Sequence, residues 1–396
     1  MDFVRRYVTD LAQSVLAPIW TWVMARSWGI RAGILAVILL IIGSFEFPDV
    51  PNGFLEEAYA LRLATFAPGG NLPLNASTIS LLKDTDQRLA KSVAGDLTEK
   101  KLDGVIMTPW STAQAIFALD GAKAASVGPD KIVAYIRGNT AANCACWTEL
   151  PTDKDGAQSV YISGWIMAAL ADLGVPPSPA ELEYVLSKQN GSEGWWSSFS
   201  DSAQYQNAST YATAWIIIGL AEQKRHGLLQ AGDLQKVNSA IEQASNWLLQ
   251  HRDQSNARWK PYPNLPAAME SESISGLVVH ALHMSGAVPT DEIDKEWLRS
   301  LPDRKIAASE VENNYFEIKA PTRAFIDHVV QIKLPWVLVA TADAYQSGDI
   351  WTKGKALRWM EANITDKSVA TADANDTNWW RAELLYALKR TLQRAG

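Results

Sequence analysis

The chain has 396 residues and a formal net charge of −7. This length is sufficient for one large hydrophobic core or two domains. A mildly acidic chain without a basic cluster excludes a nucleic-acid-binding surface, so we expect no nucleic-acid partner. The 17 Trp residues are unusual. They fit either wedges between packed helices or platforms on which sugar rings stack.

An uncharged stretch near the N-terminus predicts a membrane anchor. Residues 32–45 carry no charged side chain, and the predicted transmembrane helix spans residues 28–47, with Arg31 reaching the interface. Arginines precede this stretch and acidic residues follow it, so the N-terminus is expected in the cytoplasm and the rest outside the inner (plasma) membrane. A cleaved signal peptide is the alternative, but no small-residue cleavage site follows the apolar run.

The segments on either side of the anchor have different compositions. Residues 1–27 predict a cytoplasmic segment in which the apolar stretch 11–25 lies in the membrane interface as an amphipathic helix, or simply extends the anchor. Residues 48–75 are rich in Pro and Gly and predict a linker around a short helix at 54–65. Residues 76–396 then form the main domain.

The main domain repeats at about 50 to 60 residues, a period that indicates stacked pairs of helices. One set of predicted helices is apolar nearly all round and rich in small residues, as buried inner helices are: 109–121, 159–174, 209–223, 270–286, 328–348 and 378–392. A second, amphipathic set alternates with it: 77–94, 129–137, 179–188, 234–250, 291–301 and 352–363. Six such pairs predict an all-α fold, an (α/α)6 toroid of six helical hairpins. An open solenoid is the alternative, but polar capping repeats are not evident.

One stretch marks where an outer helix ends and fixes the repeat register. Residues 184–196 read Tyr-Val-Leu-Ser-Lys-Gln-Asn-Gly-Ser-Glu-Gly-Trp-Trp, and degraded copies lie at 135–147 and 247–259. The pattern resembles the QW-type repeat of the terpenoid cyclase/prenyltransferase superfamily. That resemblance covers residues 76–392 and implies an α/α toroid. We interpret the stretch as a clasp between an outer helix end and the loop that enters the next inner helix.

The catalytic motifs that the resemblance implies are absent from the sequence. A protonating cyclase needs an Asp-x-Asp-Asp acid, which neither 84–87 nor 373–376 supplies. A protein prenyltransferase needs Asp, Cys and His around zinc, whereas Cys144 and Cys146 have no nearby His. His280 and His283 share a helix face but lack an obvious third ligand. We therefore predict neither a metal nor a cofactor.

The N-termini of the inner helices are expected to meet at one mouth of a central cavity, where polar and aromatic residues gather. Glycoside hydrolysis needs two carboxylates about 5 to 10 Å apart, and Glu270 or Glu272 with Asp327 is the candidate catalytic pair. The same acids could instead cap helix N-termini. The predicted ligand-binding residues on this rim are Trp110, Tyr161, Tyr211, His328, Trp379, Trp380 and Arg381.

Two further features bear on function. The connection 302–327 is too long for a routine turn and predicts a segment that covers or flanks the mouth. Cys144 and Cys146 could form a disulfide outside the cytosol or remain buried thiols.

Two classes of function follow. The first is a membrane-anchored, extracytoplasmic, non-catalytic module that binds a partner protein, such as a membrane protein, or an envelope ligand. The second is an anchored enzyme, of the glycoside hydrolase or lyase type, that acts on a glycan or lipid-linked substrate. We favour the first because every familiar catalytic signature is missing. An isoprenoid cyclase or transferase is the least favoured.

Overall fold

The computed structural model describes residues 72–99, 108–119, 128–148, 158–199, 207–265, 268–307, 310–319, 324–365 and 378–395. Within these ranges the chain forms twelve α-helices, a short 3-10 turn and one two-stranded antiparallel sheet. None of the helices in these ranges combines the length and the hydrophobicity that crossing a bilayer requires. The predicted interfacial segment and anchor, and most of the predicted linker, fall within residues 1–71, outside the described residues.

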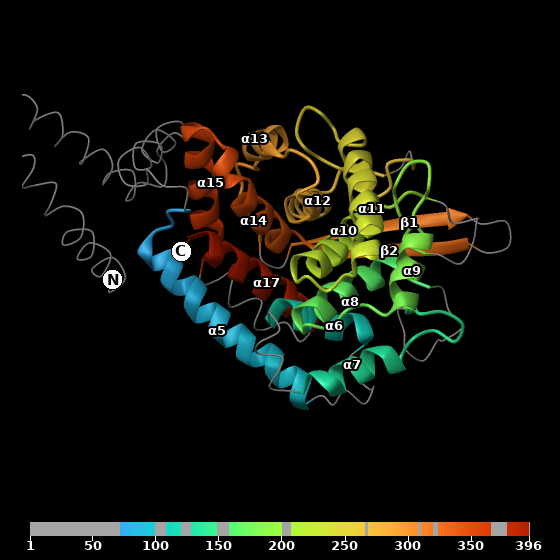
Figure 1. The fold of residues 1–396 in the computed structure, drawn as a ribbon. Helices are drawn as coiled ribbons and strands as arrows, with labels where there is room; N and C mark the ends of the chain where they lie inside the picture. The colour runs from blue at the N-terminus through green and yellow to red at the C-terminus, as the bar shows by residue number, and fades with distance from the viewer. Residues whose placement is uncertain are drawn as a thin grey trace, which may run out of the picture.

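Two sets of six helices alternate along the chain, as the repeat predicted (Figure 1). The inner set is buried on most faces because its residues are apolar nearly all round: α6 (Pro109–Leu119), α8 (Val160–Asp172), α10 (Thr210–Arg225), α12 (Glu272–Ser285), α14 (Lys333–Ala344) and α17 (Asn378–Ala395). The outer set consists of α5 (Ala76–Glu99), α7 (Pro129–Gly138), α9 (Pro179–Ser187), α11 (Ala231–Gln250), α13 (Asp291–Arg299) and α15 (Ile350–Asn363).

The inner helices form a closed ring. Each packs against the next in the order α6, α8, α10, α12, α14 and α17, and α17 returns to pack against α6. The last helix also packs against α5, the first described helix, where the backbone N–H of Leu72 donates to the carbonyl of Arg394 at 2.9 Å. The described part of the chain is therefore mostly helical and toroid-like, and the open solenoid is wrong.

Glycines let two pairs of inner helices, α8 with α10 and α12 with α14, approach closely. A Cβ atom built on Gly164 of α8 would overlap the carbonyl of Trp215 in α10, and one built on Gly219 would overlap the carbonyl of Gly164. A Cβ on Gly276 of α12 would lie 2.5 Å from the carbonyl oxygen of Trp336 in α14. Real Cβ atoms do not approach backbone this closely, so these positions require Gly.

The predicted clasp is confirmed and recurs three times with one spacing. The indole N–H groups of Trp147, Trp196 and Trp259 donate to the carbonyls of Ile136, Val185 and Leu248, each 11 residues earlier and close to the end of an outer helix. The carbonyl of each of these Trp residues accepts from the N-cap residue of the following inner helix, Ser159, Ser209 or Ser271. In the best copy, Gln189 adds bonds of 2.8 Å to the carbonyls of Gly194 and Ala240. Each clasp thus ties an outer helix to the start of the next inner helix.

The segment before α14 corrects the all-α expectation. Strands β1 (Val311–Lys319) and β2 (Ala324–Ile332) form an antiparallel hairpin, which extends beyond the helices (Figure 1). The connection 302–327 was expected to cover or flank the mouth, and the fifth inner helix was expected to begin near residue 328. The helix begins instead at Lys333, because the residues before it pair as a strand.

Aromatic rings occupy the axis of the inner ring, one from each helix. They are Phe117, Trp165, Trp215, His280, Trp336 and Tyr386. Trp165 and Trp215 stack with their ring centroids 3.4 Å apart, and Phe117 stacks on Tyr386 at 4.5 Å. All six are buried. We call this set the aromatic layer; it separates the N-terminal mouth of the ring from the C-terminal mouth.

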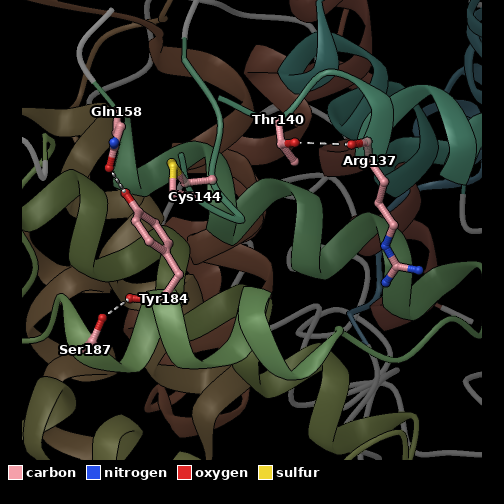
Figure 2. The surroundings of a disulfide bond; sticks show 7 residues. Arg137, Thr140, Cys144, Gln158, Tyr184 and Ser187 are labelled. Atoms are coloured by element: carbon pink, nitrogen blue, oxygen red, sulfur yellow. Dashed lines mark hydrogen bonds between the residues drawn. A yellow bond between two sulfur atoms is a disulfide. The ribbon is translucent and has the colours of Figure 1, made fainter. Parts of the chain in front are cut away.

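Cys144 and Cys146 form a disulfide in the loop between α7 and α8. Figure 2 shows Tyr184 of α9 near this loop, with its hydroxyl directed at the Gln158 side chain 3.5 Å away. The sequence allowed either a disulfide or two buried thiols, and the structure contains the disulfide.

Candidate functional site

The N-terminal mouth brings together two of the predicted aromatic residues. Tyr161 and Tyr211 occupy the first turns of α8 and α10, and their ring centroids are 5.2 Å apart. Trp110, in the first turn of α6, is half-buried against the core. All three side chains therefore lie at the N-terminal ends of inner helices, as predicted.

The predicted acids of this mouth are held by neighbouring groups. Glu272 begins α12 and pairs with Arg304 at 3.3 Å and with Lys333 at 3.2 Å. Glu270 is exposed and accepts a hydrogen bond of 3.1 Å from the Asn256 amide. Glu272 is therefore paired with two cations, and Glu270 lies at the surface.

A carboxylate that sequence reasoning missed caps α12. Glu312 of β1 accepts from the backbone N–H groups of Glu272 and Ser273 at 2.9 and 3.2 Å, and from the hydroxyls of Ser271 and Ser273. A carboxylate at this position satisfies free N–H groups and complements the helix dipole. The hairpin thereby supplies the N-terminal cap of an inner helix.

The remaining predicted rim residues lie in two elements, β2 and α17. Asp327 and His328 lie in β2, opposite Phe316 and Tyr315, which corrects their expected place at a helix N-terminus. Trp379 and Trp380 lie in the first turn of α17, and their side chains are outside the described part. Arg381 donates to the Ser92 hydroxyl of α5 at 2.7 Å, a contact between α17 and an outer helix.

The C-terminal mouth contains a cavity of about 140 Å³ that was not anticipated. Its walls come from the last turns of α6, α8 and α10 and from the second half of α17. Phe117 and Tyr386 form its floor, where the aromatic layer ends. The charged residues that line it are Asp172, Glu222, Arg225, Lys389 and Arg390.

Two of these residues are buried acids held by one arginine. The Asp172 and Glu222 side chains are 3% and 2% exposed. The Arg225 guanidinium donates to a Glu222 oxygen at 2.5 Å and lies 3.9 Å from an Asp172 oxygen. On the opposite wall, Lys389 donates to the carbonyl of Ala118 at the end of α6, at 3.0 Å.

Behind the cavity lies a buried chain of hydrogen bonds between three inner helices. Asp343 accepts from His280 Nδ1 at 2.6 Å, and His280 Nε2 is 2.6 Å from the Tyr386 hydroxyl. Burial lowers the pKa of His280 and the Asp343 charge only partly opposes it, so the imidazole is neutral. A carboxylate can only accept, so Nδ1 carries the proton and Nε2 accepts from Tyr386.

The outer end of this chain is anionic. Burial alone would raise the pKa of Asp343, but His280 and Arg390 outweigh burial and lower it. Arg394 donates to its other oxygen at 2.8 Å. Burial also raises the pKa of the Tyr386 phenol. Tyr386 therefore stays protonated and is held rigidly at the cavity floor.

Glu383, one turn before Tyr386 on α17, is a buried acid without a described cationic partner. Burial raises its pKa to about 8, although a 3.2 Å hydrogen bond from the Trp336 indole acts in the opposite direction. The carboxyl group is therefore mostly neutral at pH 7. It lies against the aromatic layer.

A signal for the C-terminal mouth was present in the sequence. Asp172, Glu222 and Asp343 all lie near the C-termini of inner helices, where the helix dipole disfavours a negative charge. Three acids in that unfavourable position indicate compensating cations or a site. The sequence predicted the site at the N-terminal mouth instead, because polar residues are more numerous there.

Comparison with known proteins adds little to this picture. No protein-family model matches the chain, and no curated protein is similar to it in sequence. Among solved structures, the chain is similar to a family 105 glycoside hydrolase from C. acetobutylicum ATCC 824, with 11% sequence identity and a TM-score of 0.43 over 78% of this chain and 99% of that chain. The narrower assignment to terpenoid cyclases finds no support.

Proposed function

We propose that this protein is a ligand-binding module of the cell envelope, and that its ligand is a small anionic group of a glycan or lipid-linked glycan held in the C-terminal cavity. The observation that carries the proposal is the charge of the cavity. The residues that line it include three cations, Arg225, Lys389 and Arg390, and two carboxylates, Asp172 and Glu222. A carboxylate or phosphate group entering this cavity would be attracted by the three cations and could accept charge-assisted hydrogen bonds from them.

The floor of the cavity suits a sugar ring. Tyr386 is fixed by His280 and stacks on Phe117, so it presents a rigid aromatic edge and a hydroxyl oxygen. A few fixed polar groups around an aromatic surface are what orients a small ligand. Preorganisation of this kind lowers the entropic cost of binding.

The contacts of the acids at the other mouth support the non-catalytic alternative. Glu272 is neutralised by Lys333 and Arg304, and Glu312 is engaged in capping α12. These acids contribute to helix termini and to the attachment of the hairpin. We therefore keep the non-catalytic function as the first choice.

We further propose that the toroid faces the extracytoplasmic side, anchored through the N-terminal apolar stretch. The disulfide between Cys144 and Cys146 supports this location, because disulfides persist outside the cytosol. The test is alkylation of the full-length protein in isolated membranes. Both thiols should resist the reagent until a reductant is added; immediate alkylation of both would contradict the location.

Binding is tested by calorimetry on the full-length protein in detergent. D-galacturonate and D-galactose differ in one carboxylate, and inorganic phosphate supplies the anion alone. Galacturonate or phosphate should bind and galactose should not, and Arg390→Gln should weaken binding at least about tenfold through loss of a charged hydrogen bond. Lys295→Gln, an exposed cation on α13, is the matched control. Equal binding of galactose and galacturonate, or none of any probe, would overturn the proposal.

One observation favours the alternative, a glycan-acting enzyme. Glu383 keeps its proton at neutral pH beside Trp336, as the general acid of glycoside hydrolysis must. The test is release of reducing ends from envelope glycans. Activity that Glu383→Gln abolishes, with Glu183→Gln on the exposed face of α9 as the control, would establish the enzyme over the binding module.

A further inference from the structure

Three potential metal ligands meet at the edge of the C-terminal cavity. Asp172 ends α8, Glu222 lies in the last turn of α10, and His226 is the C-cap residue of α10. His226 Nε2 is 3.4 Å from an Asp172 oxygen and 3.5 Å from a Glu222 oxygen. One ligand atom from each of the three lies within 4.8 Å of the others.

From this arrangement we propose that Asp172, Glu222 and His226 form a zinc site. Zinc binds nitrogen and oxygen at about 2.0–2.2 Å in a tetrahedron, which places neighbouring ligand atoms about 3.4 Å apart. Two of the three separations already have that length. Glu222 and His226 stand at i and i+4 on one helix face, and Asp172 completes the set from the adjacent inner helix.

A cation already occupies the point where these ligands converge. One terminal nitrogen of Arg225 is 2.5 Å from the Glu222 oxygen, 2.9 Å from His226 Nε2 and 3.9 Å from the Asp172 oxygen. Two nearly fully buried carboxylates require such a charge. Arg225 itself is 54% exposed, so its side chain can turn into solvent when a metal takes its place.

The ligand types select the metal. An imidazole with two carboxylates suits zinc, whereas calcium and magnesium take oxygen ligands only and in larger number. Three protein ligands leave the fourth position open toward the cavity, where Lys389 and Arg390 also stand. A bound anion could then complete the coordination. Zinc binding does not rest on the proposed anionic ligand, and it is measured without one.

The structure suggests a test in which the variant should bind better than the native protein. Untagged full-length protein in detergent is titrated with ZnCl2 by calorimetry. Arg225→Gln removes the competing cation, so the metal no longer has to displace it, and zinc binding should tighten at least about tenfold, which corresponds to about 1.4 kcal/mol. In the Arg225→Gln background, His226→Ala should weaken zinc at least tenfold.

The matched control is His251, which caps the C-terminus of α11 as His226 caps that of α10. Its ring nitrogen faces the Trp247 carbonyl at 2.9 Å, so His251→Ala should leave zinc binding unchanged, and MgCl2 should bind at least a hundredfold more weakly than ZnCl2. Circular dichroism checks that each variant is folded, with His226→Gln as a milder replacement. Equal zinc affinity with and without His226, or no gain from Arg225→Gln in folded protein, would refute the site. Failure of galacturonate or phosphate to bind would contradict the proposed function but not the zinc site.

Discussion

At the scale of single residues, the molecule places acids where the helix dipole disfavours them and compensates each with a specific cation or neutral donor. Asp343 has His280 and Arg394, and Glu222 has Arg225. Removing the partner of a buried carboxylate is destabilising, because the remaining charge stays in the interior. These residues are therefore energetically coupled, and the hydrogen bonds from Asp343 through His280 hold Tyr386 in place at the cavity floor.

Glu383 gives the clearest pH dependence, because its pKa is about 8 when folded and near the ordinary value of 4.5 when unfolded. Between these values only the folded chain holds the proton, so stability falls as pH rises through this window and levels off above it. Glu383→Gln keeps an acceptor for the Trp336 indole but cannot ionise. It should remove this slope and raise the unfolding free energy at pH 8 by about 2–4 kcal/mol.

Urea unfolding at pH 5, 7 and 9 measures the effect. Glu183→Gln, on the exposed face of α9, should keep the slope of the native protein. If Glu383→Gln showed that same slope, the carboxyl group would not be held neutral in the fold.

The geometry of these residues could be predicted from the sequence only in part. The pattern located helix ends, and with them the acids near the C-termini of inner helices, but not the contacts that these acids make. The cap on α12 depends on Glu312, which comes from a hairpin 40 residues after Glu272. The cavity at the C-terminal mouth depends on α17 packing against α6. Both are contacts between distant parts of the chain.

At the scale of elements, the sequence predicted the helix pairs well because each junction carries a local signal. The recurring Trp, 11 residues after the carbonyl that it binds, marks the end of three outer helices. The hairpin was missed because Val329, Val330 and Ile332 continue directly into an apolar helix. Pro335 was the overlooked signal: Pro fits the first turn of a helix starting at Lys333 but not the interior of one starting at His328.

The close contact between α12 and α14 yields a prediction at this scale. Gly276→Ala places a methyl group 2.5 Å from the Trp336 carbonyl, so the helices must separate and the aromatic layer must shift. We expect a loss of about 2–3 kcal/mol in unfolding free energy. Gly95→Ala in α5, where a Cβ meets nothing within 4 Å, should instead stabilise by about 0.5–1 kcal/mol. Chemical denaturation compares the two, and a stabilised Gly276→Ala would mean that the helices are not in backbone contact.

At the scale of the whole molecule, the closed ring sets this fold apart from an open stack of repeats. In an open solenoid each repeat depends only on its neighbours, and unfolding can begin at either end. Here the last inner helix packs on the first, and Lys389 and Arg381 of α17 bond to Ala118 and Ser92. Every inner helix therefore has two inner neighbours, which favours a single cooperative unit.

Removing residues 378–396 should abolish that cooperativity. The truncation exposes the faces of α6 and α14 that α17 covers, and it removes Arg394 and Tyr386, the hydrogen-bond partners of Asp343 and His280. We expect thermal unfolding of the full-length protein to coincide by far-ultraviolet circular dichroism and by Trp fluorescence. In the truncated chain the two transitions should separate and begin at least about 10 °C lower. The truncation should cost several kcal/mol of unfolding free energy, and each kcal/mol lost lowers Tm by a few degrees. The full-length variant Lys295→Gln, which changes an exposed side chain, is the control and should unfold as the native protein does. Coincident transitions at an unchanged temperature in the truncated chain would show that the repeats are stable without closure. The closed ring would then contribute nothing to the stability of the fold.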